Sequence, residues 1–327
     1  MKTNKLHTMR WLIQREFWEH KGAFLWEPLI LGAAMTLFCL LTLVLGFAAN
    51  NVQINLISDG VARSAHLNQE FTTQMINTMS NGYLWVAAPI FIMLSFIVFF
   101  YCLFGLYDER RDRSILFWKS LPVSDSLTVL SKLATAVIVA PLITIAVAIV
   151  TSLLVLLMGC VTLAIKGINV FGPVFSSPEL YFAPFELVGL LPVYLFWALP
   201  TIGWLLMVSS WARSKVFLWA VGVPVLSVVL IGWATKMFGF GWDIGWYAKH
   251  IVGRLLLGVF PGGLVHVNNS VDGHGQSFSM NQSGMAMSEI FTHSWSLLGD
   301  VETWLSVVAG AIMIYVAITM RRWREEA

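Results

Sequence analysis

The hydrophobic positions of this chain do not alternate with polar ones but gather into six long stretches. Each stretch is free of Asp, Glu, Lys, Arg and His and is long enough to cross a hydrocarbon core of roughly 30 Å as an α-helix, which takes about 17–25 residues. The stretches are 28–49, 84–106, 133–163, 187–210, 216–235 and 304–320. The pattern predicts an all-α integral membrane protein with six transmembrane helices, organised as one transmembrane domain over residues 1–327.

Composition supports this class. The chain is 57% hydrophobic and 12% charged, with a mean hydropathy of +0.75, whereas soluble domains carry about 25% charged residues. So few polar residues could not cover the apolar surface, and we expect lipid to cover it. Cys39, Cys102 and Cys160 all lie in predicted spans and show neither metal-ligand nor disulfide spacing, so we interpret them as small buried apolar residues.

The basic residues indicate the orientation. Fifteen of the 20 Lys and Arg residues flank the spans on one side, in the N-terminal segment, the loops after the second and fourth spans, and the C-terminal tail. By the positive-inside rule both termini are expected in the cytoplasm of a multi-pass cell-membrane (inner-membrane) protein.

The segment 251–267 resembles a seventh span but is interrupted. Arg254 lies within it and Pro261-Gly262-Gly263 breaks it, so its apolar run is too short to cross. We expect a re-entrant or interfacial helix on the outer face, within the large outer segment 236–302 that precedes the last span.

The N-terminal segment 1–27 has a helical period of its own. Leu6, Met9, Ile13 and Phe17 recur on one side of the helix, and nearby tryptophans suit the headgroup zone. The pattern favours an amphipathic helix on the inner membrane surface; the alternative is a helix of a cytoplasmic bundle.

The loop after the second span, 107–126, has the strongest functional signal. A run of charged residues is followed by an apolar run that includes Phe117 and Trp118, and Pro122 then ends the helix. We expect a short cytoplasmic helix whose charged end faces a soluble partner, because mixed charges give specific pairing. A solvated loop with positive-inside arginines would explain the basic residues but not the acidic ones. The charged run is Asp108, Glu109, Arg110, Arg111, Asp112 and Arg113.

Several catalytic signatures are absent from the sequence. It contains no GxxxxGK[ST] phosphate loop, no HExxH, no CxxC and no GxSxG. The predicted spans also lack the charged residues that usually mark an ion or proton pathway. We therefore expect no catalytic, cofactor-binding or metal site in this chain, and a transporter of this kind would take its energy from another subunit.

At this loop the chain resembles the permease subunits of type-2 ATP-binding-cassette (ABC) exporters. The resemblance rests on Glu109-Arg110-Arg111-Asp112-Arg113-Ser114, followed by Lys119-Ser120-Leu121-Pro122-Val123-Ser124, within the six-span arrangement. In such permeases this loop is the coupling helix that docks into the ATPase. The resemblance implies that the following residues couple to the partner: Asp108, Glu109, Arg110, Arg111, Asp112, Arg113, Ser114, Phe117 and Trp118.

The resemblance also implies the assembly. It predicts a homodimer or a pair of different permeases, two ABC ATPase subunits that hold ATP and Mg, and the lipid bilayer as surroundings, with no nucleic-acid partner. This chain itself is then not an enzyme. The substrate stays open, although aromatic, uncharged spans favour lipids, amphiphiles or hydrophobic peptides over small ions.

Two other classes remain as alternatives. A membrane-embedded enzyme acting on lipid could use His250, Asp243, Glu289 and His293, and a non-transporting assembly or sensory subunit would need no site at all. A soft-metal site is a third possibility for one outer stretch, where ordinary loop packing is the favoured interpretation because the spacing is irregular. Its His and Met residues are His266, His274, Met280, Met285, Met287 and His293.

Overall fold

The computed structural model describes residues 5–48, 73–74, 76–112, 123–165, 168–239, 241, 243–260 and 287–323. These residues form helices joined by short turns, and no strand occurs among them. Six helices are long and apolar enough to cross a membrane, which confirms the all-α membrane fold. The candidate spans are Gly22–Leu45, Ile76–Arg111, Asp125–Ile165, Pro178–Trp211, Val216–Phe238 and Val301–Trp323.

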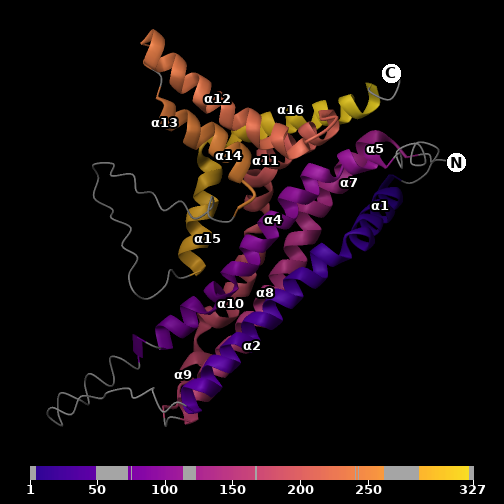
Figure 1. Cartoon of the computed structure of the whole chain (residues 1–327). Helices are drawn as coiled ribbons and strands as arrows, with labels where there is room; N and C mark the ends of the chain where they lie inside the picture. Colours follow the sequence, from indigo (N-terminus) through magenta and orange to yellow (C-terminus); the bar gives the residue numbers. More distant parts are fainter. Residues whose placement is uncertain are drawn as a thin grey trace.

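Most spans are built from more than one helical segment (Figure 1). The segments are α1 (Lys5–Glu19), η1 (Gly22–Trp26), α2 (Glu27–Ala48), η2 (Tyr83–Ala87), α4 (Ala88–Phe104), α5 (Tyr107–Arg111), α7 (Asp125–Ala134), η3 (Thr135–Val139), α8 (Ala140–Ile165), α9 (Phe171–Ser176), α10 (Pro178–Gly189), α11 (Leu191–Trp211), α12 (Val216–Phe238), α13 (Ile244–Trp246), η4 (Tyr247–Gly253), α14 (Arg254–Leu257), α15 (Met287–Ser296), η6 (Leu297–Gly299) and α16 (Val301–Trp323).

Local chemistry sets the helix ends. The Ser124 hydroxyl accepts from the Leu127 amide at 3.4 Å and caps α7, and Pro178 opens α10, where no amide donor is needed. Gly239 ends α12 with a φ of +68°, a left-handed conformation that glycine adopts at low cost. Asp243 Oδ1 then accepts from the Trp246 amide at 3.1 Å and starts the next helix.

The α11 helix is central to the packing and lies closely against α16. A Cβ built on Gly203 would lie 2.6 Å from the Gly310 carbonyl oxygen, and one on Gly310 would lie 2.8 Å from the Leu199 carbonyl carbon. Only glycine at both positions lets these two backbones approach so closely, as is typical of helix pairs in membranes. In contrast, α2, α12 and α16 leave large apolar side chains exposed, such as Phe38, Leu218 and Leu305, which lipid would cover.

The segment after α12 folds back into the bundle. Tyr247 and Ser227 share a hydrogen bond at 3.0 Å, Thr201 Oγ1 donates to the Arg254 carbonyl at 2.8 Å, and Ser95 Oγ donates to the Val259 carbonyl at 3.0 Å. Because Ser95 and Thr201 belong to the middle of α4 and α11, the helical residues 244–257 and the turn 258–260 lie against the middle of two spans. The sequence left re-entrant and interfacial placements open, and these contacts favour the re-entrant one; residues 261–267 lie outside the described part.

The N-terminal helix packs on the protein. In α1, Leu12 and Glu16 are buried against α7 and η3, whereas Trp11 and Trp18 are exposed. The predicted helix is therefore present, and it has contacts with the bundle that the apolar period alone did not indicate. The exposed tryptophans are compatible with contact with lipid headgroups, and the placement of α1 on the membrane surface stays a prediction. Arg321 of α16 and Arg15 of α1 both lie near Glu109 of α5, so the described ends of the chain lie at the same end of the bundle (Figure 1).

Candidate coupling site

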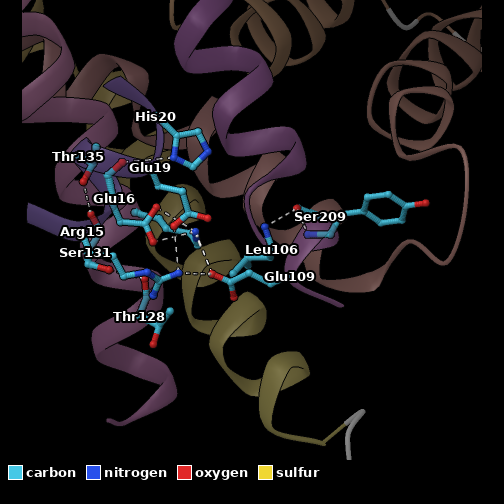
Figure 2. Close-up of polar contacts among 12 residues, drawn as sticks. Arg15, Glu16, Glu19, His20, Leu106, Glu109, Thr128, Ser131, Thr135 and Ser209 are labelled. Carbon is cyan, nitrogen blue, oxygen red and sulfur yellow. Dashed lines mark hydrogen bonds and ion pairs between the residues drawn. The ribbon is translucent and has the colours of Figure 1, made fainter. Parts of the chain in front are cut away.

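The charged run after the second span lies where the two described chain ends meet. Residues 107–111 form α5, and Asp112 follows it directly. Arg113, Ser114, Phe117 and Trp118 lie outside the described residues. The first two amides of this turn, those of Leu106 and Tyr107, donate to Ser209 Oγ of α11 at 3.1 and 3.0 Å (Figure 2). Ser209 therefore fixes where α5 begins.

Arg110 attaches α5 to the end of α11. Its Nη2 donates to the carbonyl oxygens of Ser209 and Ala212, the latter at 2.9 Å. These carbonyls belong to the last turn of a helix, where carbonyls lack intrahelical donors and the helix dipole favours a cation. The contact therefore gives these carbonyl oxygens a hydrogen-bond donor and holds α5 against the end of α11.

Glu109 points in the opposite direction, into the bundle. It is 7% exposed. Its Oε2 accepts from Arg321 Nη1 of α16 at 2.8 Å, its Oε1 lies 3.0 Å from Lys132 Nζ of α7, and the same oxygen lies 4.0 Å from Arg15 Nη2 of α1. Three cations from three other helices thus surround one carboxylate of α5.

A second buried pair extends this group. Lys132 Nζ lies 3.0 and 3.1 Å from the two carboxylate oxygens of Glu16, and the Tyr101 hydroxyl donates to Glu16 Oε2 at 2.8 Å. Arg321 Nε also donates to Asp125 Oδ1 at 3.2 Å. We call this connected set the charge network; its members are Arg15, Glu16, Glu109, Asp125, Lys132 and Arg321. Figure 2 shows Arg15, Glu16 and Glu109 of this set.

Burial makes the charge network sensitive to the loss of any member. Glu16 and Lys132 are 1% and 2% exposed. Desolvation by burial raises the pKa of Glu16, but the charge and hydrogen bonds of Lys132, with help from Tyr101 and Arg15, outweigh it, so the pKa lies below its ordinary value of 4.5. Glu16 is therefore ionised at neutral pH. Removing one partner of such a buried pair typically costs about 3–5 kcal/mol, because the other charge stays buried.

The remaining described charges of the loop face outward. Asp108, Arg111 and Asp112 are exposed. The two aspartates also line a cavity of about 540 Å³ between the α1–η1 segment and α4, together with Glu19, Glu27 and an aromatic floor that includes Phe100. The five described coupling candidates thus divide into two intramolecular anchors, Glu109 and Arg110, and three accessible charges.

The network contains residues that the sequence did not single out as functional. Arg15, Lys132 and Arg321 served there only to indicate orientation, and neither Glu16 nor Asp125 was singled out as functional. The apolar period of α1 pointed to Leu6, Met9, Ile13 and Phe17, whereas the face that is buried carries Leu12 and Glu16. Ser209, which holds the start of α5 from outside the network, had no sequence signal either.

The residues considered for a lipid-acting enzyme or a soft-metal site, toward the other end of the bundle, do not come together as one site. Asp243 caps α13, and His250 Nδ1 lies 3.1 Å from the Trp246 carbonyl while its ring stacks on that tryptophan. Glu289 and His293 are exposed on α15. Across the described ranges no group of three His, Cys, Asp or Glu side chains could hold a metal. His266, His274, Met280 and Met285 lie outside those ranges, and Met287 opens α15.

No protein-family model, curated protein or solved structure matches this chain. The resemblance to type-2 permeases therefore stays an expectation, based on the loop residues quoted above.

Proposed function

We propose that this chain is the membrane-spanning permease subunit of an exporter driven by a separate ABC-type ATPase. The observation that carries the proposal is the position of α5. Its exposed charges, Asp108, Arg111 and Asp112, are available to a soluble partner, while Glu109 and Arg110 bind buried groups of other helices. A displacement imposed on the exposed side of α5 would therefore be transmitted into the bundle.

The contacts of α5 reach most of the spans. Glu109 connects to α7, to α16 and to α1, which leads through η1 into α2, and Arg110 connects to α11. Together with α4, to which α5 is joined, five of the six candidate spans meet at this point. An element that only set the orientation of the chain would not need buried, directional contacts with so many helices. This arrangement supports a role in transmitting force.

The energy source in this proposal lies outside the chain. The sequence has no phosphate loop, and the apolar cores of the spans contain no Asp, Glu, Lys, Arg or His. Among the described residues, the buried charges of Glu16, Glu109, Lys132 and Arg321 gather instead at the end of the bundle that holds the described chain ends. The half-buried Arg254 lies elsewhere, with its guanidinium 4.2 Å from the centre of the Trp197 ring. An ion-driven transporter usually places such groups along a path through the membrane. ATP and Mg would therefore bind to the partner.

The family resemblance supplies the rest of the proposal. The charge network lies at the cytoplasmic end, because the basic residues collect there. Two copies of the chain, or this chain and a second permease, assemble with two ATPase subunits. Each chain contributes one α5, so one permease offers one docking position for an ATPase subunit.

Affinity purification from native membranes tests the proposal. We expect a soluble ATPase to copurify in equal amount, and its hydrolysis to be stimulated by the permease. Arg111→Glu should weaken this association, and the difference from wild type should shrink as salt is raised, since the side chain is exposed and its charge is screened. Arg213 is also exposed and lies in the turn after α11, so Arg213→Glu is the matched control. Purification of the chain without an ATPase would favour the enzyme or assembly alternatives.

A further inference from the structure

The cavity beside the charge network lies between two helical walls. The α1–η1–α2 segment forms one wall and α4 with α5 forms the other, and we call it the α1–α4 cavity. Its volume of about 540 Å³ is within the range of about 300–1,000 Å³ that small-molecule sites occupy. Glu109 and Lys132 of the charge network also line it, and both are buried and lie 3.0 Å apart, so they form its inner side.

One row of side chains on the α4–α5 wall changes from aromatic to acidic. The row has a member at every fourth position, and residues four apart follow one another on one side of a helix. The three phenylalanine rings are 49%, 42% and 37% exposed, and both aspartates are exposed, so all five side chains are accessible from the cavity that they line. In chain order the row is Phe96, Phe100, Phe104, Asp108 and Asp112.

Neighbouring rings hold the aromatic part of this row in place. The ring centre of Phe100 lies 6.2 Å from that of Phe104 and 6.5 Å from that of Phe217 of α12. The ring centre of Phe96 lies 5.1 Å from that of Phe260. The aromatic surface is thus formed before a ligand binds, which lowers the cost of ordering it.

The facing wall also carries carboxylates. Glu19, Ala23 and Glu27 line the cavity from α1, η1 and α2, again four positions apart, and both glutamates are exposed. Glu19 pairs with Arg15 at 3.2 Å, whereas Glu27 forms no ion pair with any described residue. Lipid alone would cover the phenylalanines. It would not account for carboxylates on both walls at the end of the bundle where Lys and Arg collect.

We propose that the α1–α4 cavity binds an amphiphilic organic cation, with its ammonium group among the carboxylates and its hydrocarbon part along the phenylalanines of α4. Both carboxylates and the faces of aromatic rings attract a cation. A compact metal ion fits less well, because no group of three described His, Cys, Asp or Glu side chains could hold one. A zwitterionic lipid would place its phosphate beside the same carboxylates, and like charges in contact are unfavourable.

Photolabelling of the purified full chain in dodecyl maltoside micelles tests the site. The probe is a long-chain alkyl trimethylammonium with a photoreactive group on its chain. The comparison probes carry the same chain on an uncharged alcohol or on phosphatidylethanolamine. We expect the ammonium probe to label α4 and α2, and both comparison probes to label them several-fold less. Labelling is measured without an ATPase, so its result does not depend on the proposed function.

Substitutions in the cavity walls show which side chains hold the cation. Glu27→Gln removes one carboxylate, and Phe100→Leu removes one ring but keeps an apolar side chain. Each should weaken labelling by about threefold, the effect of one contact of an accessible cation. Ala23→Phe, which fills the cavity, should abolish labelling. Glu179→Gln and Phe38→Leu are the matched controls, because both residues are exposed and neither lines the cavity.

Thermal unfolding separates loss of the site from loss of structure. Glu27 is exposed and Phe100 is 42% exposed, so both variants should unfold close to the wild-type temperature and lose part of the stabilisation that the ammonium probe gives to the wild type. Four results would overturn the proposal: no labelling, equal labelling by the alcohol probe, stronger labelling by phosphatidylethanolamine, or labelling that neither wall variant weakens. Weaker labelling in Glu27→Gln and Phe100→Leu, with unchanged labelling in the two controls, would support it.

Discussion

Arg321, in the last turn of α16, donates through Nη1 to Glu109 Oε2 at 2.8 Å, which ties the end of α16 to the short helix α5. Both side chains are buried, at 5% and 7% exposed. The arginine therefore does more than mark one side of the membrane. It holds α16 and α5 at a fixed distance, and Lys132 and Glu16 extend the same arrangement to α7 and α1.

Glu109→Gln should destabilise the protein. The substitution keeps the shape of the side chain but leaves Arg321 and Lys132 without this carboxylate, for an expected cost of about 3–5 kcal/mol. A lower midpoint of thermal unfolding in detergent would show it. Asp108→Asn, in the same turn but exposed, should change stability by no more than about 0.5 kcal/mol. Equal shifts for the two variants would mean that Glu109 is not held as described.

The dependence of stability on pH should include a contribution from Glu16. Its pKa is lower in the folded protein than the ordinary 4.5. The pair with Lys132 is therefore fully stabilising above about 4.5 and is lost as the pH falls through the lower, folded value. Glu16→Gln should be less stable than wild type at neutral pH, and the difference should shrink below pH 4.5. A difference that stays constant across the acid range would contradict this, and Glu19→Gln, an exposed carboxylate of the same helix, is the control.

The orientation of the bundle can be tested with two matched serines. Ser214 is exposed in the turn after α11, at the end with the charge network, and Ser176 is exposed at the end of α9, at the other end. In a background without Cys39, Cys102 and Cys160, an impermeant thiol reagent should label Ser176→Cys in intact cells. It should label Ser214→Cys only after lysis. The opposite pattern would reverse the proposed orientation.

The sequence predicted the spans well because their signal is local. A stretch of about 20 apolar residues has few alternatives in a membrane, so the six spans follow from hydropathy alone. A helix that does not cross the membrane, re-entrant or interfacial, was predicted from the same reasoning, because Arg254 and Pro261-Gly262-Gly263 interrupt an otherwise apolar segment. The depth of this helix in the bundle was not predicted, because it depends on partners such as Thr201 and Ser95 that are distant in sequence.

The charge network could not be predicted because its pairs are non-local. Glu16 and Lys132 are 116 positions apart and Glu109 and Arg321 are 212 apart. In the sequence each basic residue of the network was explained by the positive-inside rule, which left no reason to look for a carboxylate partner. The mixed charges of α5 did indicate specific pairing, yet which of them pair within the chain is decided by helix rotation, and that rotation depends on packing.

The last prediction separates docking from transmission by comparing two neighbouring arginines. Arg111 is exposed, whereas Arg110 holds the Ser209 and Ala212 carbonyls. Both bonds are donated by Arg110 Nη2, and a lysine side chain keeps the charge but ends one bond short of that position. Arg110→Lys should therefore leave the ATPase bound and reduce the export obtained for each ATP hydrolysed, because α5 loses a charged hydrogen bond to α11 worth about 1.5–3 kcal/mol.

The exposed Arg111 tests how the ATPase docks. Arg111→Glu should reduce ATPase binding, most strongly at low salt where the charges are least screened, while Arg111→Lys changes binding less because the charge remains. Phe117→Ala and Trp118→Ala, in the loop beyond the described part of α5, are expected to behave like Arg110→Lys if the aromatic side chains tie the loop to the spans. The measurements are the amount of copurified ATPase, its hydrolysis rate and export in vesicles. If Arg110→Lys loses the ATPase while Arg111→Glu keeps it, the exposed side of α5 is not the docking surface, and the assignment of anchors and contacts within this turn has to be reversed.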